Sequence, residues 1–401
     1  GRALAGVAIA LTTGTATSSA GLTYPWGSFA PGPGKTHPIA NGISWTRIPM
    51  PGSLGHINSW LLDDGDGIAV VDSGMLLKEC SDAWKALFDG DLKGKRVTRV
   101  VGTHLHPDHI GLAGWLCKRF DCDVWMTRGE WLTARMLSSD VREDVPPEAL
   151  ALQRSAGWDE DVLAQQAAKG WGRFGRMLYP MPISYHRIKD GDVLDFGAHQ
   201  WRVVVGSGHS PEHACLWNEA EGVLVSGDQV LPRISSNVSV NMSEPNADPL
   251  GEWLASIDKL LAVLPDDLLV CPAHGEPFKG LHTRLIALRD EHLRRLDQVH
   301  AAIGQAPLRT IDCFPLLFNR KIGEDGDVPT GGGTDITKAL GYCAQLVREL
   351  GQGGQVEIGG DRLQAQQHGQ AQYGQQNPIH GRQHRHGEIT ASRPAVAIAT
   401  A

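Results

Sequence analysis

The densest group of metal-ligating side chains in this 401-residue sequence lies in the stretch Thr103-His104-Leu105-His106-Pro107-Asp108-His109-Ile110-Gly111. The apolar run at 97–101 predicts a strand before it, and the alternation of side chains along a strand places the imidazoles of His104 and His106 on one side. Asp108 and His109 come where a helix over 110–120 is expected to begin. Imidazole and carboxylate groups are zinc ligands, and these side chains can surround two adjacent cations. The stretch therefore predicts a metal site.

Short apolar runs bounded by Gly or Asp alternate with amphipathic segments on both sides of this motif. The runs read as buried strands, and segments with a repeat of three to four residues read as helices. The expected strands are 59–62, 68–71, 97–101, 201–205, 222–226 and 268–270. The expected helices of the same region are 76–88, 112–120 and 131–137. This alternation is typical of a layered domain that combines sheets and helices.

Strand signals stop in a helical insertion at 130–187, which is rich in Trp, Met and Tyr. Two interpretations remain open for it. Its aromatic and Met side chains either form an ordinary helical core or make an apolar lid over a substrate pocket.

The ends of the chain differ in composition from its middle. Residues 1–21 carry Arg2, an apolar run and small residues, which resembles a signal segment. We expect the main domain to span 22–280. A C-terminal helical unit at 281–351 is predicted from the apolar spacing in 281–303 and from a second helix that begins at Asp335 and ends at Gly351. Residues 352–401 are rich in Gln, Gly and His, and such a composition predicts disorder.

Charge and cysteine content exclude some classes of protein. The sequence has 37 Lys and Arg against 45 Asp and Glu, a net charge of −8, which argues against a nucleic-acid partner. No stretch approaches the roughly 20 apolar residues that a bilayer requires, so no membrane partner is expected. The seven cysteines form no CxxC pair, which favours free thiols in the cytoplasm. If residues 1–21 are a signal segment, the alternative location is periplasmic or secreted.

Four further motifs stand at or just after the ends of expected strands. In sequence order they are Val71-Asp72-Ser73-Gly74, Gly208-His209-Ser210, Ser226-Gly227-Asp228 and Pro272-Ala273-His274-Gly275. Together with the first motif, they resemble the metallo-β-lactamase superfamily over residues from about 55 to 280. The resemblance implies an α+β fold, a four-layer αββα sandwich, here followed by a helical, winged-helix-like C-terminal unit.

The resemblance also implies a ligand set for two Zn²⁺ ions per chain, with Fe or Mn as alternatives. His104, His106 and His209 would hold one ion. Asp108, His109 and His274 would hold the other, and Asp228 would bridge the two. A hydroxide between the metals would be the nucleophile, and Asp108 would be catalytic by orienting it and moving its proton. The nearby His213, His56 and Asn58 are predicted to form supporting hydrogen bonds instead of ligating metal.

The resemblance narrows the reaction to a metal-dependent hydrolase with two main substrate hypotheses. Antibiotic-destroying members lack a bridging aspartate such as Asp228, whereas glyoxalase II-like thioesterases, lactonases and RNase Z-like nucleases have one. We expect hydrolysis of a small-molecule thioester or carboxylic ester, of the acyl thioester or lactone type. The alternative is a phosphodiesterase or endoribonuclease, since the C-terminal helices are similar in placement to those of the β-lactamase-like protein 2 subgroup.

Two other interpretations stay open beside these. One is an iron-dependent oxidoreductase similar to persulfide dioxygenases, which share the ligand set. The other is a binding module with structural metals, although seven ligands for two ions leave coordination positions open, as catalytic sites do. The sequence leaves the oligomeric state undetermined.

Overall fold

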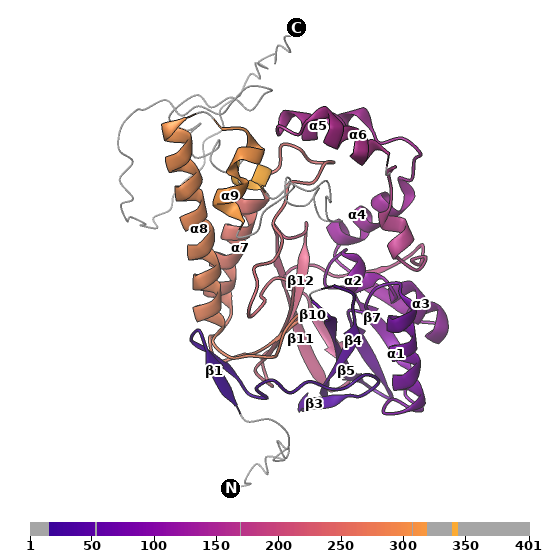
Figure 1. Ribbon diagram of the computed structural model, residues 1–401. Coiled ribbons are helices and arrows are strands. Elements are labelled where there is room, and N and C mark those ends of the chain that lie inside the picture. The colour runs from indigo at the N-terminus through magenta and orange to yellow at the C-terminus, as the bar shows by residue number, and fades with distance from the viewer. Residues whose placement is uncertain (1–15, 53, 169, 307, 319–338, 344–401) are drawn as a thin grey trace, which may run out of the picture. The chain divides into compact units, whose positions relative to one another are not determined.

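Two mixed β-sheets form the centre of the computed structural model (Figure 1), which describes residues 16–52, 54–168, 170–306, 308–318 and 339–343. These residues all belong to one unit that spans residues 1–366. The predicted disordered tail at 352–401, the ends Asp335 and Gly351 of the second C-terminal helix and most of the signal-like segment lie outside the described residues.

The first sheet has seven strands in sequence order. They are β3 (His37–Ala40), β4 (Ile43–Pro49), β5 (His56–Asp64), β6 (Gly67–Val71), β7 (Val97–Val101), β8 (Asp123–Met126) and β9 (His186–Arg187). Pairing is antiparallel from β3 to β6 and parallel from β6 to β9. Parallel neighbours need a crossover, and helices supply the first two. Helix α1 (Lys78–Asp89) joins β6 to β7, and helices α2 (Pro107–Ile110) and α3 (Ala113–Phe120) join β7 to β8.

The second sheet has five strands, again in sequence order. They are β10 (Val193–Phe196), β11 (His199–Gly206), β12 (His213–Asn218), β13 (Val223–Gly227) and β14 (Leu269–Pro272). Only the last pair, β13 and β14, is parallel, and helix α7 (Pro249–Val263) makes the crossover between them.

Apolar side chains from both sheets form the central core. Trp45 and Trp60 of the first sheet stack with ring centroids 6.0 Å apart, and they belong to the same buried cluster as Trp201 and Val203 of the second sheet. Each such side chain contributes roughly 1.5–3 kcal/mol when it is fully buried. The two sheets are therefore packed face to face over a dry core.

Helices cover the outer face of each sheet. Trp84 of α1 and Leu116 of α3 pack in one buried cluster with residues of the first sheet. Trp253 of α7 and Leu285 of α8 (Leu281–Gln305) pack in another cluster with residues of the second sheet. The order helix, sheet, sheet, helix confirms the predicted four-layer α+β sandwich of the metallo-β-lactamase type.

The insertion at 130–187 is largely helical, although its last two residues form β9. Its helices are α4 (Arg128–Ser139), which begins two residues before it, α5 (Pro147–Ser155), α6 (Glu160–Ala167) and the 3₁₀ helix η1 (Phe174–Met177). The burial of its apolar residues differs from one position to the next. Trp131 of α4 is buried in the core, whereas Leu132 and Met136 on the same helix are 57% and 44% exposed.

The C-terminal residues that the structure describes are largely helical. The predicted amphipathic helix is α8, which buries Leu281, Leu285, Leu288, Leu296, Val299 and Ile303. The 3₁₀ helix η2 (Thr310–Cys313) and α9 (Phe314–Leu317) follow it, and residues 339–343 are helical. At the other end, β1 (Thr17–Ser19) and β2 (Leu22–Tyr24) form a two-stranded sheet. None of the described helices is long and apolar enough to span a membrane.

Several strands were missed by the sequence analysis, among them β4, β8 and β12. Strand β4 carries Ser44, Thr46 and Arg47 between its apolar residues, and β12 begins with His213. Strand β12 was missed although residues 214–217 form an apolar run, whereas the polar side chains of β4 break the apolar runs by which buried strands were predicted. The fold tolerates them because they find hydrogen-bond partners, such as the carbonyl oxygen of Lys35 for the Thr46 hydroxyl.

Candidate metal centre

Loops at the carboxyl ends of four strands bring the predicted ligands together. His104 and His106 follow β7, His209 follows β11, Asp228 follows β13 and His274 follows β14. Asp108 and His109 lie within α2, immediately after the first loop. Strand ends at one edge of a sandwich are a rigid frame for such a site.

The prediction that strand alternation aligns His104 and His106 was wrong. Strand β7 ends at Val101, and residues 102–106 are irregular. Nevertheless, Nε2 of His104 and Nδ1 of His106 lie 2.8 Å apart, with the two rings nearly perpendicular. The loop therefore determines the relative position of the two rings. Contacts from other parts of the chain hold the loop in place.

All seven predicted ligands fall into three overlapping groups, within each of which the ligand atoms lie within 4.8 Å of one another. The groups are His104, His106 and His209; His104, His109 and Asp228; and Asp108, His109 and His274. In the first group, Nε2 of His104 is also 3.1 Å from Nε2 of His209.

Asp228 lies between the first and the third group. Its carboxylate oxygens are 3.5 Å from Nε2 of His209, 3.6 Å from Nε2 of His109 and 3.5 Å from Nε2 of His274. Asp108 approaches the third group, with Oδ2 at 3.4 Å from Nε2 of His109 and 3.2 Å from Nε2 of His274. The position of Asp228 suits a ligand shared by two cations.

In the part of the chain that the structure describes, some of the ligand atoms lack a hydrogen-bond partner that a metal ion would replace. Nε2 of His109 and Oδ1 of Asp228 are buried and have no hydrogen-bond partner among the described residues. Buried polar atoms are normally paired, so this exception needs an explanation such as an ion. The five imidazoles and two carboxylates of the three overlapping groups are a donor set that zinc accepts.

The protonation states of His104, His106 and Asp108 also suit metal binding, whereas nearby carboxylates outweigh burial and raise the pKa of His109 and His274, whose rings lose a proton when they bind an ion. Burial, with a smaller contribution from His209, lowers the pKa of His106 to about 3, and burial likewise holds the pKa of His104 well below its ordinary value. Burial alone would raise the pKa of Asp108. The charge of His109 and the hydrogen bonds from His109 and His274 to Asp108 outweigh that effect and lower the pKa. Neutral imidazoles and an ionised carboxylate are the forms that bind metal.

Hydrogen bonds from neighbouring groups orient the imidazoles. Nδ1 of His109 is 2.7 Å from Oδ2 of Asp72, the early aspartate of the family motif. Asp72 has a positive φ of 60° and also accepts hydrogen bonds from the backbone N–H and the hydroxyl of Thr103. A non-glycine residue in this conformation is uncommon and is often found at functional sites.

The residues predicted to support the ligands do so. Nδ1 of His274 lies 2.9 Å from the carbonyl oxygen of His56, and the ring of His56 accepts a hydrogen bond from the N–H of Gly275. The ring of His213 accepts one from the N–H of Asp228. Asn58 donates to the carbonyl oxygens on either side of the His274 turn. Such contacts fix ring orientation and raise metal affinity.

One glycine in a ligand motif is required by its surroundings. Gly208, which precedes His209, has a φ of 100°, and a Cβ there would lie 2.5 Å from the carbonyl oxygen of Pro249 and 2.6 Å from the backbone nitrogen of Trp253. Only glycine combines this conformation with so close an approach. The packing of α7 against the loop thus fixes the position of His209.

Two contributors were missed by the sequence analysis, Glu130 and Asn237. Glu130 is fully buried beside the ligand loops, and the carbonyl oxygen of Asn237 is 2.6 Å from Nδ1 of His209. Thr127 and Glu130 have the spacing of a capping box, a signal that would have predicted the start of α4 but not this role. No signal marks Asn237, because a backbone carbonyl group is independent of residue type.

A cavity of about 480 Å³ opens beside the first ligand group. Its lining includes His106 and His209, the apolar side chains Leu132 and Met136 of α4, and several polar residues. The polar residues include Ser239, Asn241, Ser243, Glu244 and Glu252. The metal centre therefore has an open side with one apolar wall.

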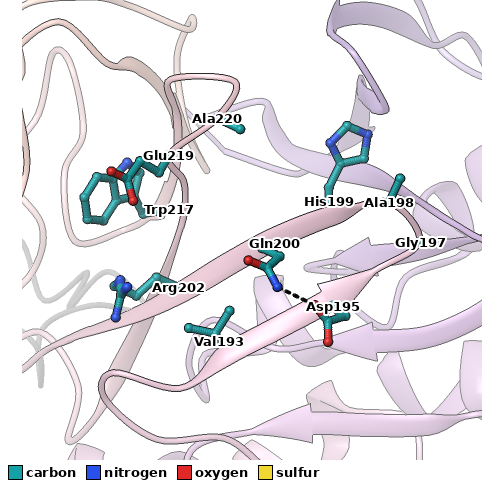
Figure 2. Close-up of a pocket in the computed structure, with 10 residues that line it drawn as sticks. All are labelled: Val193, Asp195, Gly197, Ala198, His199, Gln200, Arg202, Trp217, Glu219 and Ala220. Carbon is teal, nitrogen blue, oxygen red and sulfur yellow. Dashed lines mark hydrogen bonds between the residues drawn. The ribbon is translucent and has the colours of Figure 1, made fainter.

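A second cavity, of about 590 Å³, lies over strands β10, β11 and β12 and includes none of the predicted ligands. Figure 2 shows Trp217, Arg202 and His199 around it and the hydrogen bond from Gln200 to Asp195. This cavity shares no residue with the ligand groups and is separate from the candidate site.

Comparisons with known proteins agree with this site. The model of the metallo-beta-lactamase superfamily matches residues 52–274. This chain belongs to that superfamily and is a hydrolase of it. A crystal structure of a beta-lactamase domain protein from Burkholderia ambifaria is 36% identical, with a TM-score of 0.70, covering 82% of this chain and 94% of that chain.

Curated relatives are more distant in sequence. A probable metallo-hydrolase of Bacillus subtilis is 23% identical over 288 residues, which is 69% of this chain and 86% of the relative. The acyl-coenzyme A thioesterase MBLAC2 of Gallus gallus is 28% identical over 300 residues, 71% of this chain and 95% of the relative. An atrochrysone carboxyl ACP thioesterase of Aspergillus aculeatus is 27% identical over 177 residues, 43% of this chain and 52% of the relative.

Proposed function

We propose that this protein is a dinuclear zinc hydrolase that cleaves acyl thioesters of small molecules. The observation that carries the proposal is the open cavity beside the ligand cluster, where Leu132 and Met136 present apolar surface next to His106 and His209. Two of the relatives are named as acyl thioesterases, which supports the same choice among the activities of the superfamily.

Leu132 and Met136 lie four residues apart on α4, so their side chains are neighbours on one face of the helix. Both are more than 40% exposed and both line the cavity, so an apolar ligand in the cavity would cover them. An acyl chain that lies along this face would place its carbonyl group toward the ligand cluster. Fe or Mn in place of zinc would use the same donors.

The metal ions and the side chains of the protein have different roles in the reaction. When bound, the two ions polarise the carbonyl group and make water a nucleophile near neutral pH. Asp108 is ionised, lies between His109 and His274, and orients the attacking water and accepts its proton. A thiolate leaves readily, since thiols have a pKa of about 8.5, so the thioester needs no strong general acid.

Two acidic residues of the same cavity argue against RNA as the substrate. Glu244 and Glu252 line it and would repel phosphate groups. A lactone remains compatible, because its carbonyl chemistry is the same. The seven cysteines are free, which supports our proposal of a reducing, cytoplasmic location.

The test is a panel of initial rates for the zinc-reconstituted full chain. The panel contains acyl-coenzyme A thioesters, an acyl lactone, a β-lactam and a short single-stranded RNA, each with an Asp108→Ala control. We expect turnover of thioesters that is sensitive to a chelator and lost in the control. RNA cleavage without turnover of any ester would overturn the proposal.

A further inference from the structure

The side chain of Glu130 is buried between two loops that carry metal ligands. Its Oε2 atom accepts a hydrogen bond from the backbone N–H of Leu105 at 2.9 Å. Its Oε1 atom accepts one from the hydroxyl of Ser210 at 2.6 Å and one from the backbone N–H of Glu212 at 2.7 Å. A carboxylate with three donors is held firmly in one orientation.

These partners stand next to the ligands of the first group, one of which, His104, also belongs to the second group. Leu105 separates His104 from His106, and Ser210 follows His209. Glu130 therefore connects the two loops that supply the three imidazoles of the first ligand group. Because 80 residues separate Glu130 from Ser210, this connection exists only in the folded chain.

The connection is reinforced from the other direction. Oε2 of Glu212 accepts a hydrogen bond from the N–H of Gly129 at 2.7 Å, and the hydroxyl of Thr127 donates to the carbonyl oxygen of Glu212 at 2.7 Å. The first turn of α4 and the loop after His209 are thus tied at several points. Neither can shift without the other.

The third ligand group has a different support. The side-chain amide of Asn58 donates to the carbonyl oxygens of Pro272 at 2.9 Å and Gly275 at 2.8 Å, on either side of His274. The carboxamide oxygen of Asn58 accepts in turn from Nε1 of Trp45 at 2.8 Å. Neither of these contacts reaches the loops that Glu130 holds.

We infer that Glu130 is a positioning residue for the metal ion at His104, His106 and His209, and that Asn58 serves the ion at His274 independently of it. The inference rests on the metal sites of the proposed function but not on the identity of the substrate. Each residue acts through a loop, so loss of either weakens one ion and leaves the other bound.

The matched variants are Glu130→Gln and Asn58→Asp, which exchange a carboxylate and an amide with almost no change of shape. Glutamine keeps one acceptor oxygen and turns an NH₂ group toward an N–H donor. Aspartate removes both donors to the turn around His274. We expect zinc affinity to fall about 10–100-fold at one site in each variant, the range found when supporting residues of metal sites are changed.

The measurement is a zinc titration of the full chain against a chelating indicator, with the visible spectrum of the cobalt(II)-loaded protein as a second readout. His106→Ala and His274→Ala provide reference spectra for loss of each site. We expect the spectrum of Glu130→Gln to change toward that of His106→Ala, and the spectrum of Asn58→Asp toward that of His274→Ala. A role only in stability would not move the two spectra in different directions.

Ser210→Ala is the second variant if Glu130→Gln does not fold. It removes one of the three hydrogen bonds to Glu130, and we expect a smaller loss of affinity for the same ion. Unchanged affinity for both ions in these variants, or equal weakening of both ions in a folded variant, would overturn the inference. If the variants behave as expected but the protein turns over no thioester, the proposed substrate fails and the inference stands.

Discussion

Nδ1 of His209 lies 2.6 Å from the backbone carbonyl oxygen of Asn237, which stands 28 residues further along the chain. A carbonyl oxygen can only accept, so Nδ1 carries a proton and Nε2 is the atom that faces His104 and Asp228. In the same segment, the hydroxyl of Ser236 donates to the carbonyl oxygen of Asp228. The loop after β13 thus supports His209 of the first group and the backbone of Asp228, which lies between the groups.

The C-terminal helices hold this loop in turn. Nε2 of His292 on α8 is 3.1 Å from the hydroxyl of Ser235, and Nδ1 is 2.6 Å from the hydroxyl of Tyr342. Burial raises the pKa of Tyr342 to about 12, so its hydroxyl stays protonated at neutral pH. The helices after residue 280 are therefore part of the support of the metal centre.

Tyr342→Phe should destabilise the protein without abolishing its chemistry. Removal of a buried hydrogen bond typically costs about 1–3 kcal/mol, because the partner is left in a buried position. We expect a loss of this size in the free energy of unfolding by urea, with kcat reduced by less than about tenfold. Tyr185→Phe, at a partly exposed ring, is the control and should change stability by less than about 0.5 kcal/mol. Equal stability of Tyr342→Phe and the wild type would contradict the prediction.

Asp108→Asn should reduce kcat by about 10²–10⁴-fold, the range for loss of a general base. The amide has nearly the same shape but cannot accept the proton of the attacking water. Steady-state rates on an acyl thioester test this, with metal content measured on the same samples. Asp290→Asn, at an exposed position of α8, is the control and should leave the rate unchanged. A metal-loaded Asp108→Asn protein with near wild-type kcat would show that Asp108 is not catalytic.

Metal removal should lower thermal stability. Each ion that binds only the folded state contributes about 4 kcal/mol when its free concentration is a thousand times its dissociation constant. In addition, the carboxylates of Asp108 and Asp228 lose their compensating charge. We expect scanning calorimetry with a chelator to show a midpoint several degrees lower, restored by added zinc. An identical midpoint in chelator and in zinc would argue against a bound metal.

Leu132→Ser and Met136→Ser should reduce the preference for long acyl chains. Each buried methylene group contributes about 0.8 kcal/mol. For each methylene group of the acyl substrate that no longer contacts these residues, we expect kcat/KM to fall several-fold. The measurement is the ratio of kcat/KM for a ten-carbon and a four-carbon acyl thioester. Leu293→Ser on α8, 37% exposed and not part of the cavity lining, is the control. The prediction fails if both cavity variants keep the wild-type ratio.

One cysteine should react with thiol reagents much faster than the others. Cys122 is partly exposed, while the other six are buried. A hydrogen bond from Cys117 lowers the pKa of Cys122, whereas burial raises the pKa of Cys215 to about 12. Titration with a chromogenic disulfide at pH 8 should show a single fast equivalent, absent in Cys122→Ser. Several fast equivalents in the native protein would refute this.

The strands that frame the site could be predicted where apolar residues dominate a short run. The run at 68–71 became β6, which is buried throughout, and 97–101 became β7 with Thr98 and Arg99 half-buried between its valines. Strand β12 was missed although residues 214–217 form an apolar run, and the burial of His213 at its start involves a hydrogen bond from the N–H of Asp228, 15 residues further along the chain. The proposed domain boundaries stay predictions.

The sequence alone determined the ligand types, their order along the chain and the strand that precedes each of them, since these are properties of neighbouring residues. Only the tertiary structure decided the loop path that joins His104 to His106 and the bonds from Glu130, Asn58 and Asn237. Those bonds join segments from 25 to 217 residues apart. Contacts at such separations depend on how the layers pack, and that packing is a property of the whole core rather than of any local stretch.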